Sequence, residues 1–172
     1  SINKQVYIAI LLFLCSTLSG LAQSENLSPK KVEKFNQAFF EAERLKLIDD
    51  FIKAEKYYQE CLNIDPNNAT VLYELSGLSF IEKDYEQARI YAERSVELAE
   101  DKRWVRVRLI EVYTILNMKD DVVIQYQELI ASYPQNSEYR WRLAESYLKA
   151  SQFEKCIAQL NQLERIEGIS EP

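Results

Sequence analysis

The chain has 172 residues, 47% of them hydrophobic, which suits one domain or a short array with a real hydrophobic core. Only 3 glycines and 4 prolines interrupt it, and this favours an all-helical fold. The 27 acidic residues outnumber the 21 basic ones, so the net charge of −6 disfavours binding to DNA or RNA.

The first 22 residues differ from the rest of the chain. Lys4 is their only charged residue, and it precedes the apolar run VYIAILLFLCSTLSGLA, which ends in the small-residue site Gly20-Leu21-Ala22. A basic start, an apolar middle and a small-residue site are typical of a secretory signal peptide. We therefore expect cleavage near Gln23 and export of the mature chain.

Two alternatives for this leader stay open. A retained membrane anchor is disfavoured because the clean apolar run is shorter than the roughly 20 residues that cross a bilayer. A lipoprotein signal would use Cys15, but the bulky Leu14 stands before it where such signals have a small residue. For an exported chain we expect the periplasm or the periphery of the outer membrane, which are oxidising surroundings.

A period of about 34 residues runs through the rest of the chain. Pro66 and Pro134 lie two periods apart, and Ala54 and Ala88 lie one period apart. Four units align without an insertion when the first begins at Phe35. The units are 35–68, 69–102, 103–136 and 137–170, preceded by a polar leader and helix start at 23–34 and followed by an expected truncation point at 171–172.

Each unit is expected to form two antiparallel helices that approach each other closely. The eighth and twentieth positions of the units mostly hold small residues, which allow this approach. Proline at the end of a unit stops the second helix because it lacks an N–H group. The small residues are Ala42, Ser76 and Ala144 at position eight, and Ala54, Ala88 and Cys156 at position twenty.

This pattern resembles the tetratricopeptide repeat family over residues 35–170. The resemblance implies an all-α fold, a right-handed α-solenoid of four tandem helix-turn-helix repeats after the signal peptide. Three residues depart from the family pattern: Glu41 and Ser79 are polar where bulk is usual, and Ile110 is large in the small eighth position. The alternative is a helical bundle with an accidental period.

Polar residues near the expected helix starts predict N-caps, because their side-chain oxygens accept bonds from free backbone N–H groups. The predicted caps are Asp49 or Asp50, Asp84, Asp101, Ser137 and Ser151.

The sequence offers no catalytic or metal site. It has no histidine, so a serine–histidine or cysteine–histidine nucleophile pair cannot form. The acidic pairs at 49–50, 100–101 and 120–121 lie at expected helix starts, where carboxylates favour the positive end of the helix dipole.

Cys61 and Cys156 lie three repeats apart, far beyond the Cα separation of about 7 Å that a disulfide spans, so we expect both to be unpaired and buried. No enzyme activity, cofactor or metal is expected.

The resemblance places a protein-binding groove on the first helices of the repeats, at positions two, five, nine and twelve. These positions share one helical face and here combine aromatic side chains with a row of glutamates. Aromatic anchors of this kind hold peptide segments and partner helices. The predicted groove residues are Phe39, Tyr73, Phe80, Trp104, Glu111, Trp141 and Glu145.

Other interpretations of these residues remain. Aromatic residues at position five also pack between neighbouring repeats, and Arg108 and Arg142 are placed to neutralise the glutamates three residues later. The arginines from 103 to 142 could form a basic patch, but the interleaved glutamates favour intramolecular ion pairs. The lysine and asparagine with which chaperone-tail binders of the family grip a carboxylate are absent from positions five and nine.

We therefore expect a non-enzymatic scaffold that binds a protein or peptide partner and helps to assemble an envelope complex. The alternatives are the ectodomain of a membrane sensor and the accessory repeats of an exported enzyme whose catalytic domain lies beyond residue 172. The apolar stripe Ile157, Leu160, Leu163 and Ile166 predicts that further chain or a second copy covers the last repeat.

Overall fold

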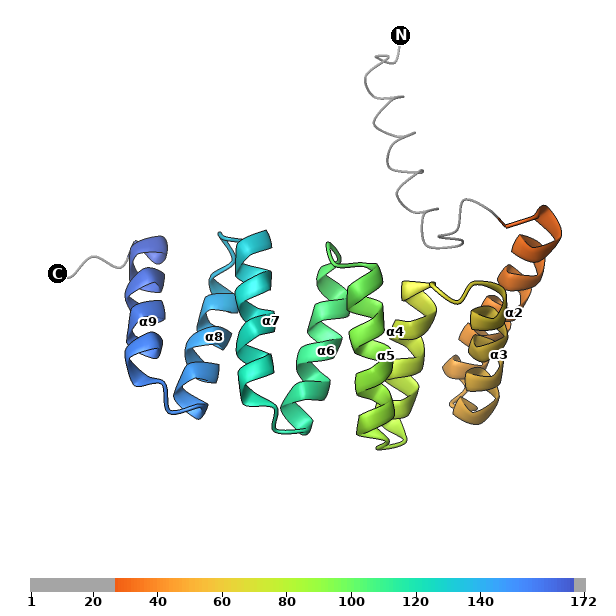
Figure 1. The fold of residues 1–172 in the computed structure, drawn as a ribbon, viewed down its shortest axis with the longest axis horizontal. Coiled ribbons are helices and arrows are strands. Elements are labelled where there is room, and N and C mark those ends of the chain that lie inside the picture. The colour runs from red at the N-terminus through yellow and green to blue at the C-terminus, as the bar shows by residue number, and fades with distance from the viewer. Residues whose placement is uncertain (1–26, 169–172) are drawn as a thin grey trace, which may run out of the picture.

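The computed structural model describes residues 27–168, and these residues form eight α-helices with no strand among them. The helices stack in one row in chain order (Figure 1), which confirms the all-α, helical-repeat fold. The predicted leader, its cleavage near Gln23, a lipid on Cys15 and the truncation point at 171–172 lie outside the described residues. The helices are α2 (Pro29–Leu47), α3 (Phe51–Ile64), α4 (Ala69–Ile81), α5 (Tyr85–Leu98), α6 (Arg103–Ile115), α7 (Lys119–Ser132), α8 (Ser137–Lys149) and α9 (Phe153–Glu167).

The helix boundaries recur with the period of the sequence. The helices α4, α6 and α8 begin at Ala69, Arg103 and Ser137, the first positions of the second, third and fourth units. The second helix of each of the first three pairs ends at an equivalent place, at Ile64, Leu98 and Ser132. Proline follows the first and third of these ends, but Glu100 stands after the second. The boundary therefore does not depend on proline.

Two of the predicted N-caps are confirmed, and three are wrong. The Asp50 and Asp84 side chains accept bonds from the backbone N–H groups of the third residue after them. The residues that precede α6, α8 and α9 are Lys102, Asn136 and Gln152, not Asp101, Ser137 and Ser151. The N-cap position of α4, α6 and α8 is the last residue of the preceding unit, one residue away from the predicted Asp101 and Ser137.

The turns inside the repeats share a backbone feature that recurs at the same position of every unit. One residue in each turn has a positive φ, although none of the four is a glycine. Ser151 is one of them, which explains why it does not cap α9. The four are Asp49 (φ 59°), Lys83 (65°), Asn117 (57°) and Ser151 (59°).

The hydrophobic core is spread along the array rather than gathered at one centre, as is usual for stacked repeats. Small residues bring the helices of a pair together, and in the second pair the Ser76 hydroxyl donates to the Ala88 carbonyl at 2.8 Å. The third pair differs, because the large Ile110 and Val122 occupy these two positions and both are buried. Figure 1 shows α6 and α7 diverging toward one end of the pair.

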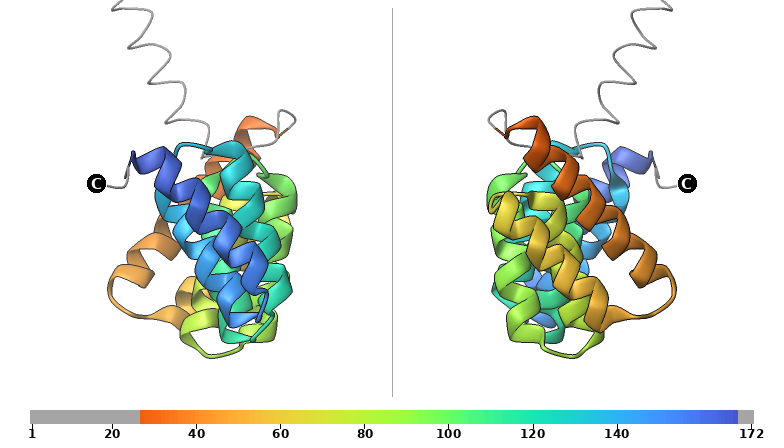
Figure 2. Two further views of the ribbon diagram at one scale, coloured as in Figure 1. Left: turned by 90° about the vertical axis from the view of Figure 1, so that its left-hand side faces the viewer. Right: turned by 90° about the vertical axis from the view of Figure 1, so that its right-hand side faces the viewer.

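The first helices of successive repeats do not all approach one another equally closely. Among the described helices, α4 and α6 are the only pair not consecutive in the chain whose backbones come close together. The backbones of α2 and α4, and those of α6 and α8, do not approach in this way. The end-on views show the helices one behind another along the row (Figure 2). None of the helices within residues 27–168 is long and apolar enough to cross a membrane.

Candidate protein-binding face

The predicted groove residues all lie on α2, α4, α6 and α8, and we call the surface of these helices the inner face. The structure does not join the seven residues into one continuous groove. Phe39 is partly buried against the core of the first repeat, and Tyr73 and Trp104 form a contact between α4 and α6. The other four line separate hollows or form ion pairs.

Phe39 is partly buried against its own repeat. Its ring stacks on Phe35 with 6.0 Å between centroids and meets Tyr58 of α3 edge-on at 5.9 Å. These contacts lie within the first repeat and not between neighbouring repeats. The place of Phe39 in a binding groove stays a prediction.

Tyr73 and Trp104 form the contact that joins α4 to α6. Their rings meet edge-on with centroids 4.6 Å apart, and the Arg108 guanidinium lies 5.1 Å from the centroid of the Tyr73 ring. Arg108 also lies against Gly77, with Nη2 3.6 Å from the place of a Cβ there. Trp104 is nevertheless 37% exposed, so this aromatic contact reaches the surface.

The glutamates of the predicted acidic row are neutralised within the chain. Glu111 pairs with Arg108 at 2.8 Å. Glu145 pairs with Lys149 at 2.8 Å and with Arg142 at 3.6 Å. Both glutamates are thus tied to cations on their own helix, and the row does not form an uncompensated negative surface.

The arginines also make intramolecular contacts. Arg106 is buried, donates to Gln125 at 2.8 Å and lies 3.6 Å from Glu100. Arg140 donates to the Gln162 side chain at 2.7 Å, and Arg142 donates to Glu138. These contacts fit the ion-pair interpretation better than a basic patch, although two of the partners are amides.

A first crevice of about 320 Å³ lies beside the Tyr73–Trp104 contact. Lys46 of α2, Tyr73 and Phe80 of α4, and Arg108 of α6 line it. Lys46 bridges the gap to α4 through a 2.6 Å ion pair with Glu74. Burial raises the pKa of Glu74, although this ion pair acts in the opposite direction.

A second crevice of about 350 Å³ opens where α6, α7 and α8 meet. Its wall includes Tyr113, and its floor includes Val122 and Tyr126 of α7. Burial raises the pKa of Tyr126, so its phenol is a neutral hydroxyl group. Of the predicted groove residues only Glu145 lines this crevice. The sequence analysis did not predict this crevice. The signal that could have indicated it is Ile110, a large residue at a position that usually holds a small one, because it keeps α6 and α7 apart.

A third, shallower hollow of about 530 Å³ lies between α8 and α9 in the last pair. Trp141, Leu148 and Leu160 line it, and Trp141 is 52% exposed. In the predicted apolar stripe of α9, Leu163 is buried while Ile157 is 57% exposed. Part of the stripe therefore packs inward and part faces solvent.

The cysteines behave as predicted. Cys61 and Cys156 are buried and unbonded. Burial raises the pKa of Cys61 to about 12, so its thiol is protonated at neutral pH. Residues 27–168 contain no group of three or more Cys, Asp or Glu side chains that could hold a metal ion.

Comparison with known proteins identifies the repeats. The sequence profile described as tetratricopeptide repeat matches residues 45–68 and 69–102. Residues 45–102 are tetratricopeptide repeats.

The fold is similar to that of a crystal structure of MamA, with a TM-score of 0.66, 14% identity and coverage of 78% of each chain. It is also similar to MamA from Desulfovibrio magneticus RS-1, with a TM-score of 0.63, 14% identity and coverage of 80% of this chain and 78% of that one. At this identity the likeness establishes the fold alone. Curated proteins gave no match to the sequence.

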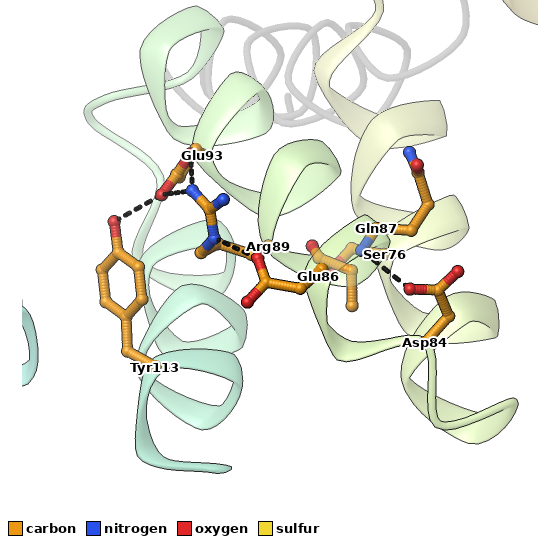
Figure 3. Close-up of polar contacts among 8 residues, drawn as sticks. Ser76, Asp84, Glu86, Gln87, Arg89, Glu93 and Tyr113 are labelled. Carbon is orange, nitrogen blue, oxygen red and sulfur yellow. Dashed lines mark hydrogen bonds and ion pairs between the residues drawn. The ribbon is translucent and has the colours of Figure 1, made fainter. Parts of the chain in front are cut away.

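The 34-residue register relates hydrogen bonds that are far apart in the chain. Tyr113 donates to Glu93 of the preceding repeat at 3.0 Å, and Arg89 holds the same carboxylate (Figure 3). One repeat later, Gln127 donates to the Tyr147 hydroxyl at 2.8 Å, and both bonds span 20 residues. Tyrosine at position eleven thus ties the third and fourth repeats to their predecessors.

A second recurrent bond closes the first two tetratricopeptide units. Ser95 donates to the Ala69 carbonyl at 2.8 Å, and the Cys61 thiol faces the Phe35 carbonyl at 3.7 Å. Both pairs join positions that are 26 residues apart. Cys61 therefore occupies in the first repeat the position that the buried Ser95 occupies in the second, which explains its burial.

Proposed function

We propose that the chain is a non-enzymatic protein-interaction scaffold that binds a segment of a partner protein along its inner face. The observation that carries this proposal is the aromatic contact of Tyr73 with the partly exposed Trp104, next to the first crevice, which Tyr73 lines. A partly exposed tryptophan is typical of the residues that dominate protein interfaces.

The electrostatics of the inner face support this proposal. Because Glu111 and Glu145 are paired with cations on their own helices, a partner does not have to neutralise an isolated row of carboxylates. Surface ion pairs are individually weak and can exchange partners at little cost. Apolar contact at Trp104 and Val107, both more than a third exposed, is therefore the main attraction that this face offers.

We further propose that the mature chain acts in the periplasm or at the outer-membrane periphery, where it helps to assemble an envelope complex. The sequence of the first 22 residues supports this placement. Fractionation of the producing cells tests it, together with the intact mass of the protein. Recovery in the cytoplasm with residues 1–22 attached contradicts the proposal.

A photo-crosslinking experiment tests the scaffold function. A photoreactive amino acid at Val107 of the inner face is compared with the same amino acid at Ile124 of α7, which is similarly exposed. We expect discrete crosslinked proteins from position 107 and fewer from position 124.

The captured protein is then purified and its affinity is measured by calorimetry. We expect Trp104→Ala to weaken binding about 30-fold, which corresponds to about 2 kcal/mol for the loss of an aromatic anchor. The thermal midpoint of the variant shows whether it remains folded. Unchanged affinity in a folded variant contradicts binding through this face.

A further inference from the structure

The second crevice has a structural cause in the third repeat. In the other repeats small residues hold the two helices of a pair together, whereas Ile110 and Val122 face each other here. In addition, the backbones of α6 and α8 do not come close together, so the side chains of α7 are accessible between them. The crevice is thus built into the packing of the described helices rather than formed by a loop.

The interior of the crevice is largely apolar. Met118 and Val122 contribute aliphatic surface, and Tyr113 and Tyr126 contribute aromatic surface. The hydroxyl of Tyr113 is held by Glu93, which fixes the position of this wall. A volume of about 350 Å³ lies at the lower end of the range for ligand pockets. It suits one large side chain with part of the backbone that carries it.

The rim of the crevice is positively charged, although the chain as a whole has a net charge of −6. Lys119, Arg142 and Lys149 line it together with a single carboxylate, that of Glu145. Within the described residues Lys119 forms no ion pair, and its ammonium group donates to the carbonyl of Lys149 at 3.2 Å. Glu145 is already shared by Arg142 and Lys149. The rim therefore carries positive charge that is not fully neutralised by carboxylates of the chain.

We infer that this crevice binds a partner segment in which a large apolar side chain, such as Leu, Met or Phe, stands next to Asp or Glu. The apolar side chain enters between α6 and α8 and contacts Val122 and Tyr126. The adjacent carboxylate pairs with Lys119 and Lys149 at the rim. This inference rests on the proposed function and names the chemistry of the segment that the inner face recognises.

Charge complementarity is the reason for choosing such a segment. A neutral segment would gain the apolar contact alone, and a basic one would meet Lys119 and Arg142. Charge-assisted hydrogen bonds at a partly enclosed rim are stronger than neutral ones. A second copy of this acidic chain could also present such a segment, so the test includes the protein itself as a competitor.

Selection from a random display library of twelve-residue peptides tests the inference. The protein is immobilised and the enriched peptides are sequenced, synthesised and measured by calorimetry. We expect the enriched peptides to carry Leu, Met or Phe within two positions of Asp or Glu. Enrichment without an acidic residue, or no enrichment at all, overturns the inference.

Two variants locate the bound peptide. Lys119→Glu reverses the charge of the rim, and Thr114→Trp fills the mouth from an exposed position on α6. We expect each to weaken binding at least tenfold. Lys56→Glu on α3 is the matched control, because it changes the net charge equally from an exposed position away from the crevice, and it should leave the affinity unchanged.

The outcomes separate this inference from the proposed function. If Lys119→Glu and Thr114→Trp bind the peptides as the unaltered protein does, the crevice is not the site and the inference fails. If Trp104→Ala weakens binding to the crosslinked partner in that case, the proposed scaffold function stands although the inference about the crevice fails. If unlabelled protein displaces the peptides through the crevice, the occupant is a second copy and the inference of a separate partner is wrong. Circular dichroism of each variant establishes that it is folded.

Discussion

Left-handed turn residues show how single positions contribute to the array. Asp49, Lys83, Asn117 and Ser151 each adopt a positive φ at the same place in their repeat. A residue with a Cβ atom is sterically strained in this conformation, and Asn and Asp tolerate it better than other residues because their short polar side chains bond locally. The energy stored in the turns therefore differs from repeat to repeat.

We predict that Lys83→Gly stabilises the protein by about 1 kcal/mol. Glycine removes the strain of a left-handed lysine, about 1–3 kcal/mol, and this exceeds the entropy that glycine loses on folding, about 0.5–1 kcal/mol. Urea denaturation of the two proteins measures the difference. Asn117→Gly is the control and should gain less, so an equal or larger gain at Asn117 contradicts the explanation.

A second residue-scale prediction concerns the helix starts. Asn68 and Asn136 cap α4 and α8 through bonds to backbone N–H groups at 3.1 and 3.4 Å, whereas Lys102 leaves α6 without a side-chain cap. Lys102→Asn should stabilise the protein by about 1 kcal/mol, the usual value of such a cap. Thermal denaturation measures it, and Asn68→Ala should show a loss of at least similar size. A neutral or destabilising Lys102→Asn would mean that α6 begins with a backbone unsuited to capping.

At the scale of elements, the repeats are joined by side chains as well as by apolar packing. The hydroxyl of Tyr147 on α8 accepts a bond from Gln127 on α7, and Tyr113 bonds to Glu93 in the equivalent place one repeat earlier. Ser79 occupies this position in the second repeat and cannot reach as far. Gln59, which would be its counterpart, donates instead to Tyr91 at 2.7 Å. The first junction is therefore built differently from the later two.

A double-mutant cycle measures the bond between the third and fourth repeats. Tyr147→Phe and Gln127→Ala, alone and together, should show a coupling free energy of about 0.5–1.5 kcal/mol, the range for a neutral hydrogen bond. Unfolding in urea gives the four values. Ser79→Ala combined with Gln59→Ala is the comparison, and we expect their effects to add. Additive effects at 127 and 147 would show that the bond contributes nothing to joining the repeats.

At the scale of the whole molecule, the array presents an apolar end. Beyond the contact of α8 with α9, the last pair leaves Trp141, Leu148 and Ile157 more than half exposed. Stacked repeats bury such surfaces against the next unit, and a contiguous exposed apolar patch is unusual on a soluble monomer. This surface is a candidate for contact with a further unit or with a second copy.

We predict that the protein spanning residues 27–168 self-associates through this end. Light scattering should show a mass that rises with concentration, because association buries apolar surface. Leu148→Glu with Ile157→Glu should restore a constant monomer mass. Ile90→Glu on α5 is the control, since Ile90 is 51% exposed but lies in the middle of the array, and it should leave the association unchanged. A constant monomer mass of the unaltered protein at high concentration contradicts the prediction.

Patterns in the sequence correctly predicted the helical class, the register of the repeats and the burial of both cysteines. These properties depend on contacts between residues that are close in the chain or one repeat apart, and the recurrence of small residues, as at Ala54 and Ala88, makes such contacts visible as a period. The same reasoning narrowed the cap of α3 to Asp49 or Asp50 and identified Asp84 as the cap of α5, because a cap is a property of one short segment. It placed the caps of α6 and α8 one residue off, where no acidic or hydroxyl side chain marks the start.

The surface that the inner face offers to a partner could not be predicted from these patterns. Whether an aromatic residue is partly buried like Phe39 or mostly exposed like Trp141 depends on how closely the neighbouring helices pack, and this packing results from the volumes of many side chains together. The large pair Ile110 and Val122 spreads one repeat and opens a crevice that no period in the sequence reveals.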